Sequence, residues 1–454
     1  MRVVVIGTGY VGLTTATVLS YIGNSVTCLD INAEKISQLQ QGILPIHEPH
    51  LDEVFEQVRH TMRFTTDYAE ADLPNTEVII IAVGTPSLPD GNADLVYLSQ
   101  AAESLAQNLG EAFTLIVNKS TVPIGTGIWL EGRIQDHIKA LKDGATKRDF
   151  NVISSPEFLS QGSALRDSFY PNRIIIGTQH APSIERFSQL FEPIHKQNFE
   201  APKCLPRPEG LREVPIFVCD MISAETIKYA ANAFLATKIS FINEMGYLAK
   251  KVGADVDAIS KGLGLDPRIG SRFLNAGIGW GGSCFGKDTA ALVATARKYD
   301  LEMSIVQAAR DVNYGLRQWI VDALQEKLGD LNGCRVTLLG FSFKPNTDDL
   351  RDAPSIDISK ELIKRGAIVT AHDPVALKNA RLYYPDLGVI YEDDLNKALE
   401  SPEAVLLLTE WQDYLHVDWQ NVPQCVIIDG RNHLDHARLR DLGFETVRFG
   451  SKQS

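Results

Sequence analysis

A glycine-rich turn near the start of the chain constrains the fold more than any other feature. The apolar run Val3–Ile6 leads directly into GTGYVG at residues 7–12, and a helical pattern follows. In such a turn Gly7 permits the sharp change of direction, Gly9 lets backbone amides approach a pyrophosphate, and Gly12 lets the helix pack closely on the strand. The succession of strand, G-x-G-x-x-G turn and helix predicts a dinucleotide-binding unit.

An acidic residue indicates which dinucleotide binds. Asp30 lies eighteen residues after Gly12, at the end of the second predicted strand. A carboxylate there accepts hydrogen bonds from a ribose diol and repels a 2′-phosphate, so the sequence predicts NAD rather than NADP. Lys35 either joins the ribose contact or is an exposed helix lysine, and Tyr10 either touches the cofactor or packs against the protein.

Strands and helices alternate in both halves of the chain, which is typical of parallel, doubly wound sheets. A loose, proline-bearing linker at 192–215 precedes a long helix that is expected from about Asp220 to Val252. The predicted fold class is α/β, with two such domains flanking a helical middle. The expected strands are Arg2–Ile6, Ser25–Leu29, Val78–Val83, Thr114–Asn118, Asn151–Ser154 and Arg173–Ile176 in the first half, and Cys334–Leu339, Ala367–Ala371, Gly388–Tyr391, Ala404–Leu408, Val426–Asp429 and Glu445–Phe449 in the second.

Charge and composition exclude several kinds of partner. With 44% hydrophobic content and a formal net charge of −13, the chain of 454 residues lacks the basic surface that nucleic acids and anionic membranes require. It contains no apolar run of about 18 residues, so we expect no membrane association, a cytoplasmic location and a small-molecule ligand. The six cysteines form no C-x-x-C motif and no cluster with histidine along the sequence, so we expect no metal site.

Cys284 is the expected nucleophile. It lies in GWGGSCFGKD at 279–288, a glycine-rich turn that an apolar, helix-favouring stretch follows from Thr289 to Ala296. The cysteine is therefore expected at a helix N-terminus, where unpaired amides and the helix dipole favour a thiolate. A reactive thiol together with a nicotinamide cofactor indicates an oxidation through a covalent sulfur adduct.

Three other groups of polar residues are candidates for the same chemistry. Lys228 and Asn232 are four residues apart on a helix and share one face, either as a solvated stripe or as a cation and an amide for a developing oxyanion. Glu157 follows a strand and is either a general base or an exposed loop acid. Thr121 also follows a strand, and it either holds a water or a substrate hydroxyl or caps a helix.

The second α/β unit begins like the first but lacks the dinucleotide turn. The strand and glycine at 334–340 continue as FSFKP, so this unit should bind something other than a second dinucleotide in the usual way. Phe341 either walls a base or belongs to the core, Lys344 is placed to reach phosphate or sugar, and Arg351 lies in the same polar loop. Arg431 follows a strand and lies either in a ligand crevice or on the surface.

Taken together, these segments resemble the UDP-glucose/GDP-mannose dehydrogenase family along essentially the whole chain. The matching segments are GTGYVG at 7–12, HEP at 47–49, AVGTP at 82–86, KSTVP at 119–123, SPEFL at 155–159, KYAANAF at 228–234, DPRIG at 266–270, GGSCFGKD at 281–288, FSFKPNTDDLRDAPS at 341–355 and DGR at 429–431. The resemblance implies two Rossmann-like, doubly wound domains joined by a long central helix. Residues 1–212 would bind NAD, residues 213–325 would form a helical dimerisation region, and residues 326–454 would bind a UDP-sugar.

The resemblance also implies a reaction, the four-electron oxidation of the C6 alcohol of UDP-glucose to UDP-glucuronate with two NAD⁺ per sugar. Cys284 would form a thiohemiacetal and then a thioester, which water hydrolyses. Lys228 and Asn232 would stabilise the oxyanion, Asp288 and Thr121 would position the catalytic water, and Glu157 would act as acid and base in hydrolysis. The first proton would go to Lys228, Asp288 or a bound water.

The patterns and the resemblance give a complete set of expected contacts. The expected cofactor contacts are Gly7, Gly9, Tyr10, Val11, Gly12, Asp30, Lys35, Thr85, Thr121, Lys287 and Arg351. The expected substrate contacts are Glu157, Phe158, Leu159, Lys228, Asn232, Arg268, Gly281, Phe341, Lys344 and Arg431. The resemblance assigns Arg268 to the sugar or its phosphate, either within one chain or across the interface of a homodimer.

One departure and several alternatives accompany this interpretation. Gln161 stands where many relatives carry an acid, and its amide can form hydrogen bonds but cannot act as a base. The same chemistry on GDP-mannose or UDP-N-acetylmannosamine is the first alternative. A two-electron hydroxyacid dehydrogenase and a non-catalytic nucleotide-sugar sensor are the others, although neither needs Cys284.

Overall fold

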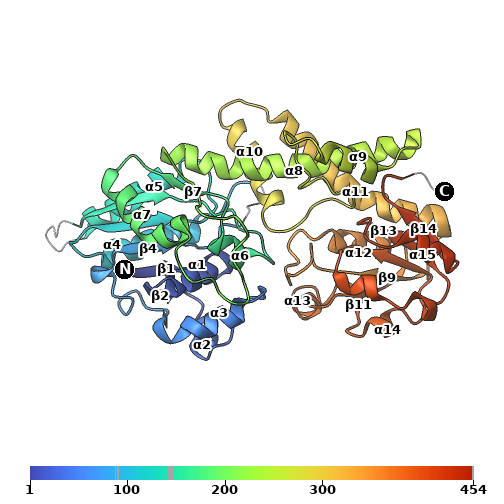
Figure 1. Ribbon diagram of the computed structural model, residues 1–454, viewed down its shortest axis with the longest axis horizontal. Helices are drawn as coiled ribbons and strands as arrows, with labels where there is room; N and C mark the ends of the chain where they lie inside the picture. Colours follow the sequence, from blue (N-terminus) through green and yellow to red (C-terminus); the bar gives the residue numbers. More distant parts are fainter. Residues whose placement is uncertain (87, 89–90, 142–147, 452–454) are drawn as a thin grey trace. The chain divides into compact units, whose positions relative to one another are not determined.

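The computed structural model describes residues 1–86, 88, 91–141 and 148–451. The chain forms two compact units, Met1–Ala230 and Ala231–Ser454, and each contains one sheet with helices around it (Figure 1). The boundary falls inside the long helix α8 (Met221–Val252), which has the bounds that the sequence predicts. Within the described ranges, no helix is both long and apolar enough to cross a bilayer.

The first unit contains an eight-stranded sheet. Its strands are β1 (Arg2–Ile6), β2 (Ser25–Leu29), β3 (Arg63–Thr65), β4 (Val78–Ile81), β5 (Thr114–Asn118), β6 (Phe150–Ser154), β7 (Ile174–Gly177) and β8 (Ile216–Cys219). Its helices before α8 are α1 (Tyr10–Tyr21), α2 (Ala33–Gln40), α3 (Leu51–Val58), α4 (Val96–Asn108), α5 (Thr126–Ala140), α6 (Ala164–Phe169) and α7 (Ala181–Lys196). The strand order is β3-β2-β1-β4-β5-β6-β7-β8, in which the first six strands have the order of a dinucleotide-binding sheet.

The expectation of a wholly parallel first sheet is wrong at one position. β6 and β7 run antiparallel and meet only at Ser154 and Gly177, whereas the other neighbouring strands are parallel. The connection between β6 and β7 contains the six-residue helix α6, and β7 enters the sheet in the reverse direction. The expected linker at 192–215 also begins too early, because α7 continues through Pro193 to Lys196. The short strands β3 and β8 were not among those predicted.

Alternating side chains of the central strands bury both faces of this sheet. On β4, Val78 and Ile80 pack in the core that contains α1, α3 and α7, and Ile79 and Ile81 pack in the core that contains α4 and α5. All four residues are completely buried. The strands are therefore continuously apolar because helices cover both faces of the sheet, as the doubly wound fold predicts.

The second unit repeats the strand order of a dinucleotide-binding sheet. Its sheet has the order β11-β10-β9-β12-β13-β14, and all its pairs are parallel. The strands are β9 (Arg335–Leu339), β10 (Ile368–His372), β11 (Ile390–Tyr391), β12 (Ala404–Leu407), β13 (Val426–Asp429) and β14 (Glu445–Arg448). The helices after α8 are α9 (Val256–Gly264), α10 (Phe285–Arg297), α11 (Ser304–Leu328), α12 (Pro354–Lys364), α13 (Leu377–Tyr383), α14 (Leu395–Ala398) and α15 (His436–Asp441). The predicted fold class is therefore confirmed.

The glycines of the first turn have the distinct roles that the motif assigns to them. Gly7 has a φ of 98°, which favours glycine. A methyl group on Gly12 would lie 1.8 Å from the carbonyl oxygen of Gly7, so α1 packs directly on the turn. A methyl group on Gly9 would meet no protein atom within 4 Å. Gly9 therefore leaves space that a ligand can use.

Alanine substitutions should separate these roles. Gly12→Ala should destabilise the first unit by more than about 2 kcal/mol, because backbone atoms would clash. Gly9→Ala should change the stability by no more than about 1 kcal/mol, the scale of a helix-cap effect, but should weaken dinucleotide binding. Thermal unfolding and NADH fluorescence titration measure the two effects. A Gly9→Ala variant that binds NADH normally would contradict this assignment.

Candidate active site

The glycine turn and Asp30 form one hydrogen-bonded unit. The Asp30 carboxylate accepts the N–H and the hydroxyl of Thr8, both at 2.7 Å, and the N–H of Asn32 at 2.9 Å. These bonds orient the acid at the end of β2. Together with the open space at Gly9, this arrangement fits a dinucleotide, with main-chain amides for the pyrophosphate and a carboxylate for the ribose.

The other expected cofactor contacts of the first unit lie in its turns and first helical residues. Tyr10 and Val11 begin α1, and Lys35 lies in the first turn of α2. The hydroxyl of Thr85 donates to the carbonyl oxygen of Thr121 at 2.6 Å and so joins the loops that follow β4 and β5. Because α5 begins only at Thr126, the helix-capping alternative for Thr121 is wrong.

A buried ion pair joins the loop after β6 to α8. The Nζ of Lys228 lies 3.2 Å from Oε1 of Glu157 and donates to the Glu157 carbonyl oxygen at 2.6 Å. The two side chains are 4% and 7% exposed, so the alternatives of a solvated helix lysine and an exposed loop acid are wrong. The second carboxylate oxygen of Glu157 accepts the N–H of Leu159 at 2.5 Å. Burial of a charge is costly without such partners, so the pair holds a carboxylate and an ammonium out of water in a fixed geometry.

Further cations lie near this pair. Lys119 follows β5, and its ammonium lies 3.5 Å from the carbonyl oxygen of Ser155. Burial lowers the pKa of Lys119 to about 8, Glu157 opposes this shift, and Lys228 adds to it. The ring of Phe158 lies 3.8 Å from the guanidinium carbon of Arg173 and 5.4 Å from the Lys228 ammonium. The positive charges in this region exceed the single carboxylate, which suits a developing oxyanion.

Glu48 of the HEP segment fixes the loop that carries Glu157. Its carboxylate is buried and accepts the N–H of Gly162 at 2.8 Å and the N–H of Ala164 at 2.6 Å, at the start of α6. Gln161 lies in this loop, and its buried Oε1 has no hydrogen-bond partner in the described part of the chain. Glu48 therefore has a structural role here.

Cys284 is the N-cap residue of α10 in the second unit, as the sequence predicts, and it is exposed. One turn later the buried carboxylate of Asp288 lies 2.9 Å from Nζ of Lys287 and accepts the Nδ2 of Asn232 at 2.6 Å. Asn232 is 7% exposed, so a solvated stripe is wrong for this residue too. A sulfur at the start of a helix whose first turn carries an acid and an ammonium, with an amide from α8 bonded to that acid, is arranged for nucleophilic chemistry.

A completely buried asparagine holds the loop that precedes the cysteine. Oδ1 of Asn313 on α11 accepts the N–H of Trp280 at 2.7 Å, and its Nδ2 donates to the carbonyl oxygen of Trp280 at 3.0 Å. A methyl group on Gly279 would lie 2.4 Å from this Oδ1, so glycine is required for the approach. We call this arrangement the Asn313 clamp.

Two arginines add to the clamp. Arg310 on α11 donates to the carbonyl oxygen of Gly286 and to the hydroxyl of Thr289, both at 2.7 Å, within the first turns of α10. Arg431 donates to the carbonyl oxygen of Gly279 at 2.8 Å and is mostly buried, so the alternative of a surface arginine is wrong. Arg431 therefore contacts the loop that precedes Cys284.

The glycine turn of the second unit is already filled by protein groups. Oδ2 of Asp373, which follows β10 as Asp30 follows β2, accepts the N–H groups of Phe341 and Ser342 and the indole N–H of Trp411. The Phe341 side chain is completely buried in the core. The expectation that its ring contacts a ligand is thus wrong, because the ring packs among the buried apolar side chains of the second unit.

The remaining expected residues lie in loops of the second unit. Arg268 is exposed and pairs with Asp266, and Arg351 pairs with Asp349. Lys344 lies 5.5 Å from the ring of Phe343. A methyl group on Gly281 would lie 2.4 Å from the carbonyl oxygen of Asp352, so close packing explains this glycine without a ligand.

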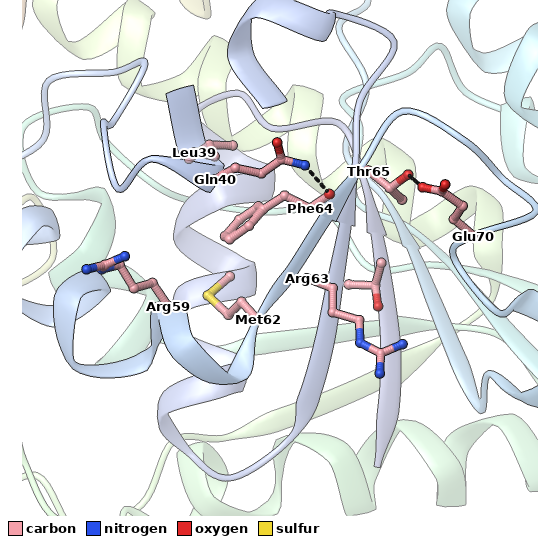
Figure 2. A pocket seen from close by; sticks show the side chains of 9 residues that line it. Leu39, Gln40, Arg59, Met62, Arg63, Phe64, Thr65 and Glu70 are labelled. Atoms are coloured by element: carbon pink, nitrogen blue, oxygen red, sulfur yellow. Dashed lines mark hydrogen bonds between the residues drawn. The ribbon is translucent and has the colours of Figure 1, made fainter. Parts of the chain in front are cut away.

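A pocket of about 390 Å³ lies elsewhere in the first unit, beside the edge strand β3 (Figure 2). In it, Gln40 donates to the carbonyl oxygen of Phe64 at 3.0 Å, and the Thr65 hydroxyl donates to Glu70 at 2.7 Å. The residues that line it are Thr27, Leu39, Gln40, Arg59, Met62, Arg63, Phe64, Thr65 and Glu70. None of these is a predicted site residue.

Within each unit the structure thus brings part of the predicted set together. The first unit joins Glu157, Leu159 and Lys228, and the second joins Asn232, Lys287 and Asp288. Sequence reasoning missed the contributions of Lys119, Arg310 and Asn313. Only the segment KSTVP carried a signal, since it contains Lys119, whereas α11 matched none of the recognised segments.

Comparison with known proteins agrees with this geometry. The chain matches three domains of the UDP-glucose/GDP-mannose dehydrogenase family in succession: the NAD binding domain at residues 1–195, the central domain at residues 222–315 and the UDP binding domain at residues 337–436.

Individual relatives match over nearly the full length. UDP-glucose 6-dehydrogenase YwqF of Bacillus subtilis is 42% identical over 457 residues, which cover 98% of this chain and 97% of the relative. The structure of a UDP-glucose dehydrogenase from Pyrobaculum islandicum is similar with a TM-score of 0.85 and 36% identity, over 95% of this chain and 94% of that one. A UDP-D-ManNAc dehydrogenase from Pyrococcus horikoshii has a TM-score of 0.81 and 26% identity, over 99% of both chains. The chain belongs to the UDP-glucose/GDP-mannose dehydrogenase family.

Proposed function

We propose that this protein catalyses the NAD-dependent, four-electron oxidation of UDP-glucose to UDP-glucuronate at C6 of the sugar. The observation that carries the proposal is Cys284 at the N-cap of α10, with the buried Asp288 one turn later on α10 and Asn232 of α8 hydrogen-bonded to it. A dehydrogenase that stops at the aldehyde needs no thiol. The relatives named UDP-glucose dehydrogenases support UDP-glucose as the substrate.

The cofactor is NAD, and most of the residues proposed to hold it lie in the first unit. The main-chain amides of the turn at 7–12 bind the pyrophosphate and Asp30 binds the ribose diol, with Tyr10, Val11, Lys35, Thr85 and Thr121 as further contacts. Lys287 and Arg351 complete the proposed set. When bound, NAD⁺ supplies the hydride acceptor for each oxidation.

Cys284 makes the second oxidation possible. Its thiolate attacks the C6 aldehyde, a C–S bond forms, and the carbonyl electron pair becomes an alkoxide that takes a proton to give a thiohemiacetal. Loss of a hydride from C6 and of the hydroxyl proton gives a thioester. Water then attacks the thioester, the C–S bond breaks, and the thiolate leaves with its electron pair while the sugar becomes a carboxylate.

The buried polar residues hold the charges that these steps create. Lys228 and Asn232 stabilise the alkoxide and the tetrahedral oxyanion, because a buried ammonium and a buried amide are donors that need little reorganisation. Asp288 and Thr121 position the attacking water. Glu157, buried against Lys228, accepts and returns the proton during hydrolysis.

Substrate contacts come from several loops. Phe158 and Leu159 flank Glu157, Gly281 precedes the nucleophile, and Arg268, Lys344 and Arg431 supply positive charge for the UDP-sugar. Three regions divide these tasks: 1–212 for NAD, 213–325 for dimerisation and 326–454 for the UDP-sugar. We also propose a cytoplasmic location, because a reducing compartment keeps the thiol of Cys284 reduced. The long central helix of the family resemblance further suggests a homodimer or a higher homo-oligomer.

The stoichiometry of the reaction tests the proposal. With limiting UDP-glucose, two NADH should form per sugar, and GDP-mannose or UDP-N-acetylmannosamine should give far less. Cys284→Ser should form no more than one NADH and no uronate, since no thioester can form. NADH absorbance and product chromatography measure both. One NADH per sugar in the wild type would remove the thioester step, and turnover of another sugar alone would change the substrate.

Loss of the Asn313 clamp should impair catalysis more than binding. Asn313→Ala leaves both main-chain groups of Trp280 unpaired, so the loop before Cys284 loosens and kcat should fall roughly 100-fold with little change in KM. The alkylation rate of Cys284 by iodoacetamide should change with it. Gln318→Ala, an exposed position on the same helix, is the matched control and should behave as wild type. An equal loss of kcat in both variants would mean that the effect of Asn313→Ala reflects general stability and not the loop before Cys284.

The ionisation of Lys119 should respond in opposite directions to its two charged neighbours. Its amine should titrate at about pH 8. Glu157→Gln removes a stabilising carboxylate and should lower the pKa of Lys119 by about one unit, whereas Lys228→Met removes a like charge and should raise it. Competitive acetylation over a pH series, read by peptide mass spectrometry, measures each value. Shifts of the same sign would contradict the arrangement.

A further inference from the structure

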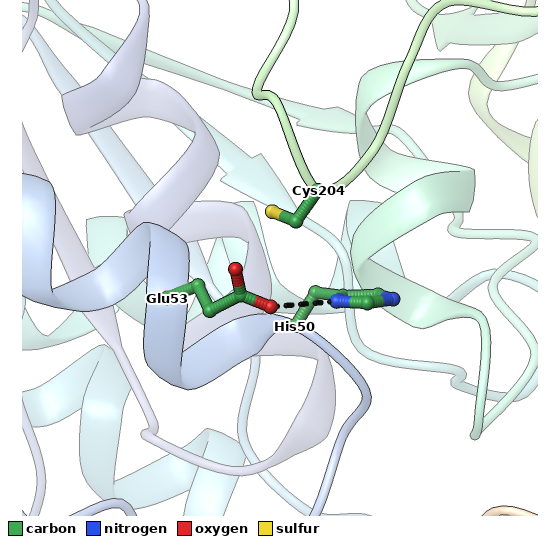
Figure 3. Close-up of side chains that lie close together, drawn as sticks. All are labelled: His50, Glu53 and Cys204. Carbon is green, nitrogen blue, oxygen red and sulfur yellow. Dashed lines mark hydrogen bonds and ion pairs between the residues drawn. The ribbon is translucent and has the colours of Figure 1, made fainter.

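Three possible metal ligands meet on the surface of the first unit, away from the predicted site residues. His50 precedes α3, Glu53 lies in its first turn, and Cys204 belongs to the segment 197–215 between α7 and β8. One ligand atom from each side chain lies within 4.8 Å of the others (Figure 3). Nδ1 of His50 lies 2.8 Å from Oε1 of Glu53. No sequence pattern predicts this cluster, because Cys204 is far from the other two residues along the chain.

We propose that His50, Glu53 and Cys204 form a Zn²⁺ site. Imidazole nitrogen, carboxylate oxygen and thiolate sulfur are the three ligand types that zinc uses in proteins, and three protein ligands leave one position for water. Small side-chain rotations bring atoms that are already this close to tetrahedral ligand spacing. On binding, the Cys204 thiol releases its proton to solvent and the sulfur electron pair goes to the metal.

The local charge favours a cation. The carboxylates of Asp52 and Glu53 both act on Cys204 from nearby. A divalent cation bound here is attracted by these charges and stabilises the thiolate. His50 and Glu53 are 44% and 55% exposed, which gives the ion a path from solvent.

The segment that carries Cys204 is already held in place beside it. The Tyr170 hydroxyl donates to the carbonyl oxygen of Leu205 at 2.8 Å, and the N–H of Leu205 donates to Pro202 at 3.0 Å. The thiol is thus presented to α3 without ordering a free loop. Zinc would clip the long segment 197–215 to the start of α3, and the site would raise stability by binding only the folded state.

Zinc uptake by the full-length protein tests the proposal. The apoprotein should take up one Zn²⁺ per chain in equilibrium dialysis with metal analysis, and Co²⁺ should give a thiolate charge-transfer band. Cys204→Ser should weaken uptake at least about tenfold and abolish the band. Cys284→Ser and Cys334→Ser are the matched controls and should bind as wild type.

A variant of His50 separates loss of a ligand from loss of the fold. His50 has a φ of 64°, so His50→Gly removes the imidazole while it suits the backbone. This variant should unfold no earlier than wild type without metal, and should lose the rise in Tm that Zn²⁺ gives the wild type. Failure of wild type to bind zinc, binding that survives Cys204→Ser, or binding lost in Cys284→Ser would each overturn the proposal. Since none of these residues belongs to the proposed reaction, the result is independent of it.

Discussion

Buried carboxylates that accept main-chain N–H groups hold the loops on which the rest of the structure depends. Glu225 accepts the N–H groups of Gly125 and Gly127 and the Ser154 hydroxyl, and so fixes the start of α5. Glu48 does the same for α6. A helix start leaves several N–H groups unpaired, and one carboxylate can satisfy two of them. Burial nevertheless raises the pKa of Glu225, so these bonds only partly offset desolvation. The loops are therefore fixed by groups that ordinary core packing would exclude.

The same interaction explains why two similar sheets take different roles. The N–H of Gly7 donates to Leu29 at 2.7 Å, and the N–H of Gly340 donates to His372 at 2.8 Å, at equivalent positions of the two sheets. The aspartate that follows the second strand of each sheet accepts hydrogen bonds from different groups in the two units. Asp30 accepts from the turn and from Asn32, whereas Asp373 accepts from its turn and from an indole N–H as well and is buried. A ribose can compete for a half-buried acid at the surface but not for one sealed beneath a tryptophan.

The sequence could predict those features that depend on neighbouring residues. The strand and glycine turn at 1–12, the helix of Lys228 and Asn232, and Cys284 at a helix start all follow from local patterns. The sequence could not predict hydrogen-bond partners that come from distant segments of the chain. Asn313 in the middle of α11 looks like any polar helix residue, and only the fold brings it to Trp280. The burial of the Phe341 ring could not be predicted for a similar reason, because nothing in FSFKP shows which side chain faces the core.

Asp288 is compatible with a thiolate at Cys284 because the charge of its carboxylate is already balanced. An isolated carboxylate one turn from Cys284 would repel the thiolate that the helix N-terminus favours. Asp288 is instead bonded to Asn232 at 2.6 Å and paired with Lys287 at 2.9 Å, both within the second unit. The amide of Asn232 donates to one carboxylate oxygen and the ammonium of Lys287 faces the other, so both oxygens are held in place. An aspartate with neither partner would be drawn toward the N–H groups of the helix and would lose this orientation, on which the proposed role of Asp288 in positioning water depends.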